Sequence, residues 1–152
     1  MIVLERLIIN ASLKTPQIDL NHLTGELVFT GKSIPENSAN LYEVVLKWVQ
    51  NYAEHPKQLT NFRLKLEYFN TSSSIWIARI IKVLSSIKRS DITIIIHLYF
   101  DITEFESMES EEIRDEIGPI IDILGTPTVN IGIKIHGIDA DGETLKETIV
   151  LI

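Results

Sequence analysis

The sequence predicts a single α/β domain whose central β-sheet is mostly parallel. Segments with a helical repeat of apolar residues alternate with segments of branched or period-two character along a chain of 152 residues. Strands separated by helices imply crossover connections, which favour parallel neighbours. No linker, repeat or low-complexity segment divides the chain, so we expect one domain over residues 1–152 with about three helices.

The N-terminal segment predicts two strands and a short connection between them. Ile2–Ile9 is rich in branched residues and is typical of a strand. Pro16–Asn21 is interpreted as a connection or a short edge strand. After a predicted turn at Leu23–Gly25, the segment Glu26–Thr30 is expected to form the next strand.

A first helix is expected after the polar loop Gly31–Ser38, in which Asn37 or Ser38 is the candidate N-cap. Pro56 is expected to end this helix of about 14 residues. The apolar residues that recur at helical spacing are Leu41, Val44, Val45, Trp48, Val49 and Tyr52.

The middle of the chain predicts a strand, a hydroxyl-rich junction and a second helix. Phe62–Tyr68 alternates apolar and charged residues, as a half-buried strand does. Asn70–Ser74 follows, and the second helix is expected to end at Lys88-Arg89. Its predicted buried stripe is Ile77, Ile80, Ile81, Leu84 and Ile87.

The next segments predict a buried strand and a third helix. Ile92–Phe100 has three consecutive isoleucines at its centre, which favours a strand covered on both faces. Ile113–Leu124 has a helical repeat, and Pro119 is expected to kink or restart that helix.

A C-terminal hairpin completes the predicted sheet. Val129–Ile135 alternates in the manner of a strand. Asp141-Gly142 is a hairpin signal, and Thr144–Ile152 is expected to return as a final strand.

Composition excludes several classes of function. The formal charge of -7 argues against non-specific binding to nucleic acid or to anionic membranes. The absence of cysteine excludes disulfides, thiolate metal sites and a cysteine nucleophile. The N-terminal apolar run is short and contains Glu5 where a signal peptide would be basic, so we expect a cytoplasmic protein.

The most informative segment is the hydroxyl run Thr71–Ser74 at the expected start of the second helix. The first N–H groups of a helix lack internal partners, and the helix dipole makes that end positive. A hydroxyl at this position can cap the helix, or it can carry a phosphate that the same N–H groups accept. Both uses remain open from the residues alone.

Two motifs together give the chain a recognisable pattern. The first is Gly-Lys-Ser-Ile-Pro-Glu-Asn-Ser at 31–38, followed by Tyr42 and Trp48, and the second is Tyr-Phe-Asn-Thr-Ser-Ser-Ser at 68–74. With Thr15-Pro16 and the acidic segment after Tyr99, the chain resembles the SiaC-type family of bacterial regulatory phosphoproteins over roughly residues 10 to 125.

The resemblance implies a STAS-like fold and control by reversible phosphorylation. Family members are phosphorylated on the threonine of the Asn-Thr-Ser motif by a dedicated kinase and dephosphorylated by a phosphatase. The unphosphorylated form binds and activates a diguanylate cyclase. Carried over to this chain, the resemblance makes Thr71 the phosphoacceptor, with Ser72 and Ser73 as alternatives.

The resemblance also implies a partner-binding surface around the two motifs. Two features depart from the family pattern: Ile75 stands where a lysine is expected, and the tail from about Thr128 extends beyond the recognised part. The expected partner-binding residues are Glu36, Asn37, Ser38, Asn70 and Ser72.

Other functions have less support in the residues. We expect no enzyme activity, because the chain lacks a Gly-rich phosphate loop, a nucleophile elbow and metal-ligand spacing. Neither a cofactor nor a metal is expected: the acidic stretch from Asp101 to Glu116 is interpreted as a solvated helix entry. A STAS-like domain that binds a small molecule or a nucleotide, without phosphorylation, is the alternative. A hydrolase is a third hypothesis, and it requires a deep pocket with a perturbed acid or base.

Overall fold

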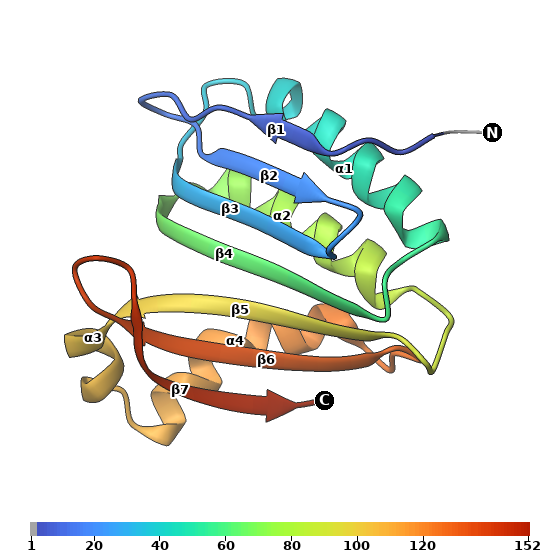
Figure 1. The fold of residues 1–152 in the computed structure, drawn as a ribbon. Helices are drawn as coiled ribbons and strands as arrows, with labels where there is room; N and C mark the ends of the chain where they lie inside the picture. Colours follow the sequence, from blue (N-terminus) through green and yellow to red (C-terminus); the bar gives the residue numbers. More distant parts are fainter. Residues whose placement is uncertain (1–2) are drawn as a thin grey trace.

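Seven strands lie side by side in the order in which they occur along the chain (Figure 1). The computed structural model describes residues 3–152. The strands are β1 (Leu7–Ile9), β2 (Gln17–Asn21), β3 (Glu26–Ser33), β4 (Leu59–Phe69), β5 (Thr93–Asp101), β6 (Asn130–Ile138) and β7 (Thr144–Leu151). The helices of this described part are α1 (Ser38–Glu54), α2 (Thr71–Ser85), α3 (Ile102–Ser107) and α4 (Ser110–Leu124).

The sheet is mixed, so the prediction of a mostly parallel sheet was wrong. Strands β3, β4, β5 and β6 run parallel to one another, but the pairs β1–β2, β2–β3 and β6–β7 are antiparallel. Short connections join the antiparallel strands, and two strands joined by a short turn must run in opposite directions. The expected C-terminal hairpin is confirmed as β6–β7.

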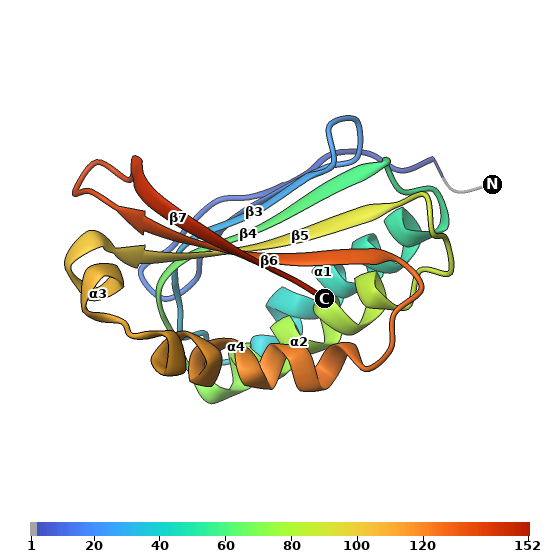
Figure 2. The same cartoon turned by 90° about the horizontal axis from the view of Figure 1, so that it is seen from below.

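The helices all cover one face of the sheet, as Figure 2 shows for α1, α2 and α4. Each crossover adds the next strand on the same side, and crossovers of one hand then place their helices on one face. No helix in residues 3–152 is long and apolar enough to span a membrane.

The predicted helices form, with several corrections. Asn37 is the N-cap of α1, and its side chain accepts a hydrogen bond from the Asn40 amide. The second helix ends at Ser85, before the basic pair at which we expected it to end. The structure has four helices rather than about three, because the acidic segment contains the separate helix α3, capped by Asp101. Pro119 lies inside α4, which continues from Ser110 to Leu124, so the helix does not restart there.

Two strand predictions also need correction. Only Leu7–Ile9 of the predicted first strand is a strand in the described residues, and Ile2 lies outside them. Ile95 is only partly buried, because the face of β5 opposite the helices has no second layer over it. The run of isoleucines therefore marks a central strand, and not a strand covered on both faces.

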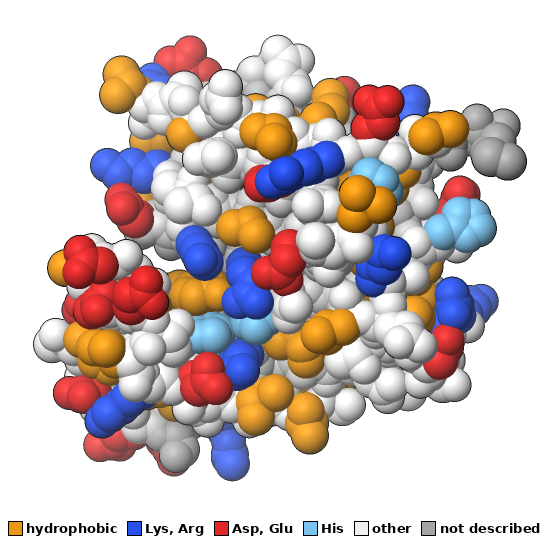
Figure 3. All heavy atoms as spheres, viewed as in Figure 1, with side chains coloured by type: hydrophobic (Ala, Val, Ile, Leu, Met, Phe, Trp, Pro, Cys, Tyr) orange, Lys and Arg blue, Asp and Glu red, His pale blue; other side chains and the backbone are white. Residues whose placement is uncertain are grey.

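The hydrophobic core lies between the sheet and the helices. The largest fully buried side chains are Ile18, Leu20, Leu27, Phe29, Tyr42, Tyr52, Phe62, Ile80, Leu84, Ile92, Ile94 and Ile96. The opposite face, which we call the open face, carries the alternate residues of each strand. These include Asp19, Glu26, Asn61, Arg63, His97 and His136. Figure 3 views this face and shows basic side chains and histidine atoms near its middle.

Gly25 is required by the close approach of the β2–β3 turn to β4. Its φ is +76°, and a Cβ added here would clash with the Leu59 carbonyl oxygen. Gly25→Ala is expected to lower the free energy of unfolding by about 1–3 kcal/mol from backbone strain, plus the cost of this clash. Gly142→Ala is the control, because φ there is +85° but a Cβ meets nothing within 4 Å. Equal urea-unfolding free energies for the two variants would contradict the role of the clash.

Candidate functional site

The start of α2 lies beside the C-terminal ends of the parallel strands β3, β4 and β5 (Figure 1). Asn70 joins β4 to α2 in an extended conformation. Its side-chain oxygen accepts hydrogen bonds from the Ser73 amide at 2.9 Å and from the Ser72 hydroxyl at 3.0 Å. The N-cap of this helix is therefore an amide side chain, and the hydroxyl of Thr71 is not needed for capping.

The four hydroxyls of the run have different environments. Ser73 is fully buried, and Ser74 donates a hydrogen bond to the Thr71 carbonyl oxygen at 2.7 Å. Ser72 donates to Asn70, as described above. Thr71 is exposed, and its hydroxyl has no hydrogen-bond partner among residues 3–152. Thr71 is thus the exposed hydroxyl of this run that makes no internal hydrogen bond in the described residues.

A buried chain of hydroxyl groups holds the first turn of α2 in place. Ser73 Oγ donates to the Ser33 carbonyl oxygen at 2.9 Å and lies 2.8 Å from Ser33 Oγ. Because Ser73 donates its hydroxyl proton to the Ser33 carbonyl oxygen, the hydrogen bond between the two hydroxyls must be donated by Ser33. The Tyr42 hydroxyl must then donate to Ser33 Oγ, at 2.6 Å. Burial raises the pKa of Tyr42, so this phenol remains a donor. The chain ties α2 to the end of β3 and to α1.

The loop between β3 and α1 begins beside this cluster, because the Asn70 amide donates to the Ser33 carbonyl oxygen. Glu36 is exposed and pairs with Lys14 at 2.6 Å, and the Lys14 hydrogen bond lowers the pKa of Glu36. Asn37 uses its side chain to cap α1, and Ser38 is the first residue of that helix. The structure therefore places both sequence motifs at one edge of the sheet, with the side chain of Glu36 directed to Lys14.

The surface around Thr71 is apolar. Tyr68, Phe69 and Ile75 are 60%, 49% and 50% exposed, although large apolar side chains are usually buried. Exposed apolar side chains that gather in one place are typical of a protein-binding surface. Ile75 adds to this surface at the position where the family resemblance led us to expect a lysine.

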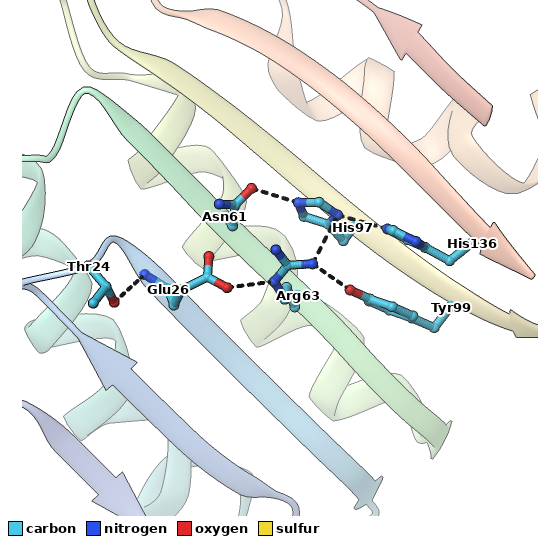
Figure 4. Close-up of polar contacts among 7 residues, drawn as sticks. All are labelled: Thr24, Glu26, Asn61, Arg63, His97, Tyr99 and His136. Atoms are coloured by element: carbon cyan, nitrogen blue, oxygen red, sulfur yellow. Dashed lines mark hydrogen bonds and ion pairs between the residues drawn. The ribbon is translucent and has the colours of Figure 1, made fainter. Parts of the chain in front are cut away.

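Sequence reasoning missed a polar network on the open face (Figure 4). Arg63 donates to Glu26 at 2.8 Å and to the Tyr99 hydroxyl at 2.7 Å. His97 lies 2.8 Å from both His136 and Asn61, although it is only 4% exposed. The signal in the sequence was the polar residues that share one face of β4 to β6, such as Arg63, His97 and His136, but the pairing of the strands cannot be read from it.

Burial is the main cause of the altered histidine pKa values in this network. It lowers the pKa of His97 from 6.5 to about 3, and the charge of Arg63 acts in the same direction. Burial also lowers the pKa of His136, while Glu147 opposes the shift. Both rings are therefore neutral near pH 7 and act as structural hydrogen-bonding groups.

Asn70 and Thr71 are expected to differ in their contribution to stability. Asn70→Ala removes the cap and should lower the free energy of unfolding by about 0.5–2 kcal/mol. Thr71→Ala removes an exposed hydroxyl without an internal partner, so its effect should stay within about 0.5 kcal/mol. Urea unfolding followed by circular dichroism measures both, and a larger loss for Thr71→Ala would show that this residue is chiefly structural.

Comparison with known proteins identifies the family. The model of the SiaC family of regulatory phosphoproteins matches residues 9–123. The chain belongs to the SiaC family. The crystal structure of the diguanylate cyclase SiaD in complex with its activator SiaC, from Pseudomonas aeruginosa, matches with a TM-score of 0.66 and 24% identity. That match covers 86% of this chain and 99% of the other.

Two further proteins are similar to the chain, one in fold and one in sequence. Apo-SiaC from Pseudomonas aeruginosa matches with a TM-score of 0.59 and 22% identity, over 84% of this chain and 98% of that one. An uncharacterized protein of Pseudomonas aeruginosa strain UCBPP-PA14 is 37% identical over 59 residues. This alignment covers 39% of the present chain and 47% of the relative, so the chain matches about half the length of this curated protein.

Proposed function

We propose that this protein is a STAS-like regulatory module that changes partners according to the phosphorylation of Thr71. The observation that carries the proposal is the free, exposed hydroxyl of Thr71 at the start of α2, in a member of a family of regulatory phosphoproteins. The buried state of Ser73 argues against that residue as the acceptor. Ser72 is less suitable than Thr71 because its hydroxyl bonds to the cap residue.

The start of α2 suits a phosphate. The amides of Thr71 and Ser72 have no backbone partner within residues 3–152, while the amides of Ser73 and Ser74 bond to Asn70. A phosphate on Thr71 would accept hydrogen bonds from such free amides, and the helix dipole favours its charge. The phosphorylated state therefore needs no basic side chain for its local stability.

The proposed output is the activation of a diguanylate cyclase by the unphosphorylated form. A structurally similar protein, SiaC, is the activator of the diguanylate cyclase SiaD in their complex. The exposed Tyr68, Phe69 and Ile75 supply an apolar contact surface for such a partner. In this proposal the protein is cytoplasmic and acts by binding rather than by catalysis, and a cognate kinase and phosphatase set its state. Glu36 and Ser38 belong to the same proposed contact surface.

Phosphopeptide mapping tests the acceptor. After incubation with the cognate kinase, phosphate is expected on Thr71 and to be absent from Thr71→Val, which keeps the size of the side chain. Ser72→Ala is the matched control and should be labelled as the wild type is. Phosphate confined to Ser72, Ser73 or Ser74, or undiminished labelling of Thr71→Val, would contradict the assignment.

A further inference from the structure

A cavity of about 350 Å³ lies between α2, α4 and the helix-covered side of β4 and β5. Strands form its floor and the two helices form its sides. Its lining is almost entirely apolar and includes Leu64, Leu98, Ile77, Ala78, Ile81 and Ile120. An apolar lining of this kind favours an apolar occupant.

A hydrogen bond joins the two helices near their C-terminal ends. Lys82 Nζ on α2 donates a hydrogen bond to the Ile123 carbonyl oxygen near the end of α4, at 3.3 Å. Ser74, near the start of α2, and Glu116, in the middle of α4, also line the cavity. The Ser74 hydroxyl already donates to the Thr71 carbonyl oxygen, and the Tyr99 hydroxyl accepts from Arg63. The exposed Glu116 therefore supplies the free polar group of the described lining.

We propose that this cavity binds a small apolar molecule that is neutral or positively charged. Its volume lies at the lower end of the range of about 300–1,000 Å³ for small-molecule pockets. The carboxylate of Glu116 disfavours an anion and can pair with a cationic head group. The described lining contains no lysine or arginine, so it lacks the groups that bind the phosphates of a nucleotide.

A docked peptide fits the cavity less well than a small molecule does. The strands and both helices border a space of about 350 Å³, whereas an α-helix with its side chains is about 10–12 Å wide and would remain largely outside. Thr71 is not among the lining residues, so Thr71→Val should bind the same ligands as the wild type.

Fluorescence of N-phenyl-1-naphthylamine, a neutral apolar probe, tests binding to the full chain. We expect saturable binding, with displacement by octylamine at least fivefold stronger than by octanoate. In Glu116→Gln, octylamine should lose most of its advantage over octanoate, because the variant lacks the negative charge that attracts the amine and repels the carboxylate. Absence of saturable probe binding, or an unchanged ratio in Glu116→Gln, would overturn the proposal.

A substitution that fills the cavity should weaken binding of the probe. Ala78→Phe places a ring among the lining residues and is expected to weaken probe binding at least tenfold. Ala53→Phe is the matched control on α1, where the side chain borders a shallow groove elsewhere, and it should bind as the wild type does.

If Ala78→Phe fails to fold, methyl NMR spectra of the wild type show where the probe binds. Probe addition should shift the methyl signals of Ile77, Leu98 and Ile120, and leave that of Ile18 in place. Shifts confined to other regions, or equal binding by folded Ala78→Phe, would overturn the assignment of the cavity.

Discussion

Phosphorylation of Thr71 is expected to weaken binding of the output partner by roughly thirty- to a hundredfold, and Thr71→Asp should act in the same direction. The modification adds about −1.5 to −2 charges to a surface on which Tyr68, Phe69 and Ile75 are exposed. A partner that covers this surface must remove water from the new charge. Loss of one compatible contact, at about 2–3 kcal/mol, accounts for the expected change in affinity.

Isothermal titration calorimetry with a diguanylate cyclase of the same genome measures this effect. Thr71→Val should keep the affinity of the unphosphorylated protein, because it removes the hydroxyl without adding charge. Thr30→Asp is the matched charge control, since Thr30 is an exposed residue on the open face of β3. It should bind the partner as the wild type does, although it changes the net charge by the same amount as Thr71→Asp.

The phosphate should act at the interface and leave the fold unchanged. Interaction of a charge with the helix dipole is worth up to about 2 kcal/mol, whereas a domain is stable by about 5–15 kcal/mol. Asn70 caps the helix, and the chain from Tyr42 through Ser33 to Ser73 holds its first turn. Thr71→Asp should therefore keep the wild-type circular dichroism spectrum. Equal affinities of the wild type, Thr71→Asp and the phosphorylated protein would rule out this mechanism, and a large refolding would favour an internal switch.

The helices and the parallel strands between them were predicted from the sequence better than the outer strands of the sheet were. The helical repeats of α1, α2 and α4 are long, and tertiary packing leaves such repeats in place. The relative direction of the outer strands was harder to predict, because β2 is only five residues long and its sequence also fits a connection. Once β2 pairs with both β1 and β3, three short connections make the outer strands antiparallel.

The candidate site was located by its motif, but the use of each side chain was not predictable. Asn70 and Thr71 are both good N-caps, and only the geometry shows that the asparagine takes this position. Ser33 and Ser73 are 40 residues apart and meet because β3 and β4 end side by side. The same limit applies to the open face, where Arg63 and His97 come from different strands.

The open-face network has one consistent arrangement of protons. Asn61 accepts through its side-chain oxygen, so His97 Nε2 carries the proton and Nδ1 is an acceptor. His136 Nε2 then donates to His97 Nδ1, and Thr144 donates to His136 Nδ1 at 3.1 Å. Arg63 lies 3.5 Å from the same Nδ1, which agrees with an acceptor there.

Protonation of this network is unfavourable in the folded protein. Arg63 and Lys65 from β4 and Lys134 from β6 act against a charge on His97. Glu147 from β7 acts in favour of a charge on His136, and Glu26 from β3 is already paired with Arg63. Between pH 6.5 and about 3, the unfolded chain therefore binds a proton at His97 that the folded protein does not.

The free energy of unfolding is consequently expected to fall as the pH is lowered from 6.5 towards 3. Because the pKa of His97 is depressed in the folded state, its contribution is complete above pH 6.5 and is lost with a slope of up to about 1.4 kcal/mol per pH unit. His97→Gln removes the titrating group, so it should be less stable at pH 7 and should show a flatter pH profile. His55→Gln is the control, since His55 is exposed and lies outside the network. Urea unfolding at a series of pH values measures both slopes, and a wild-type slope in His97→Gln would show that other groups cause the acid sensitivity.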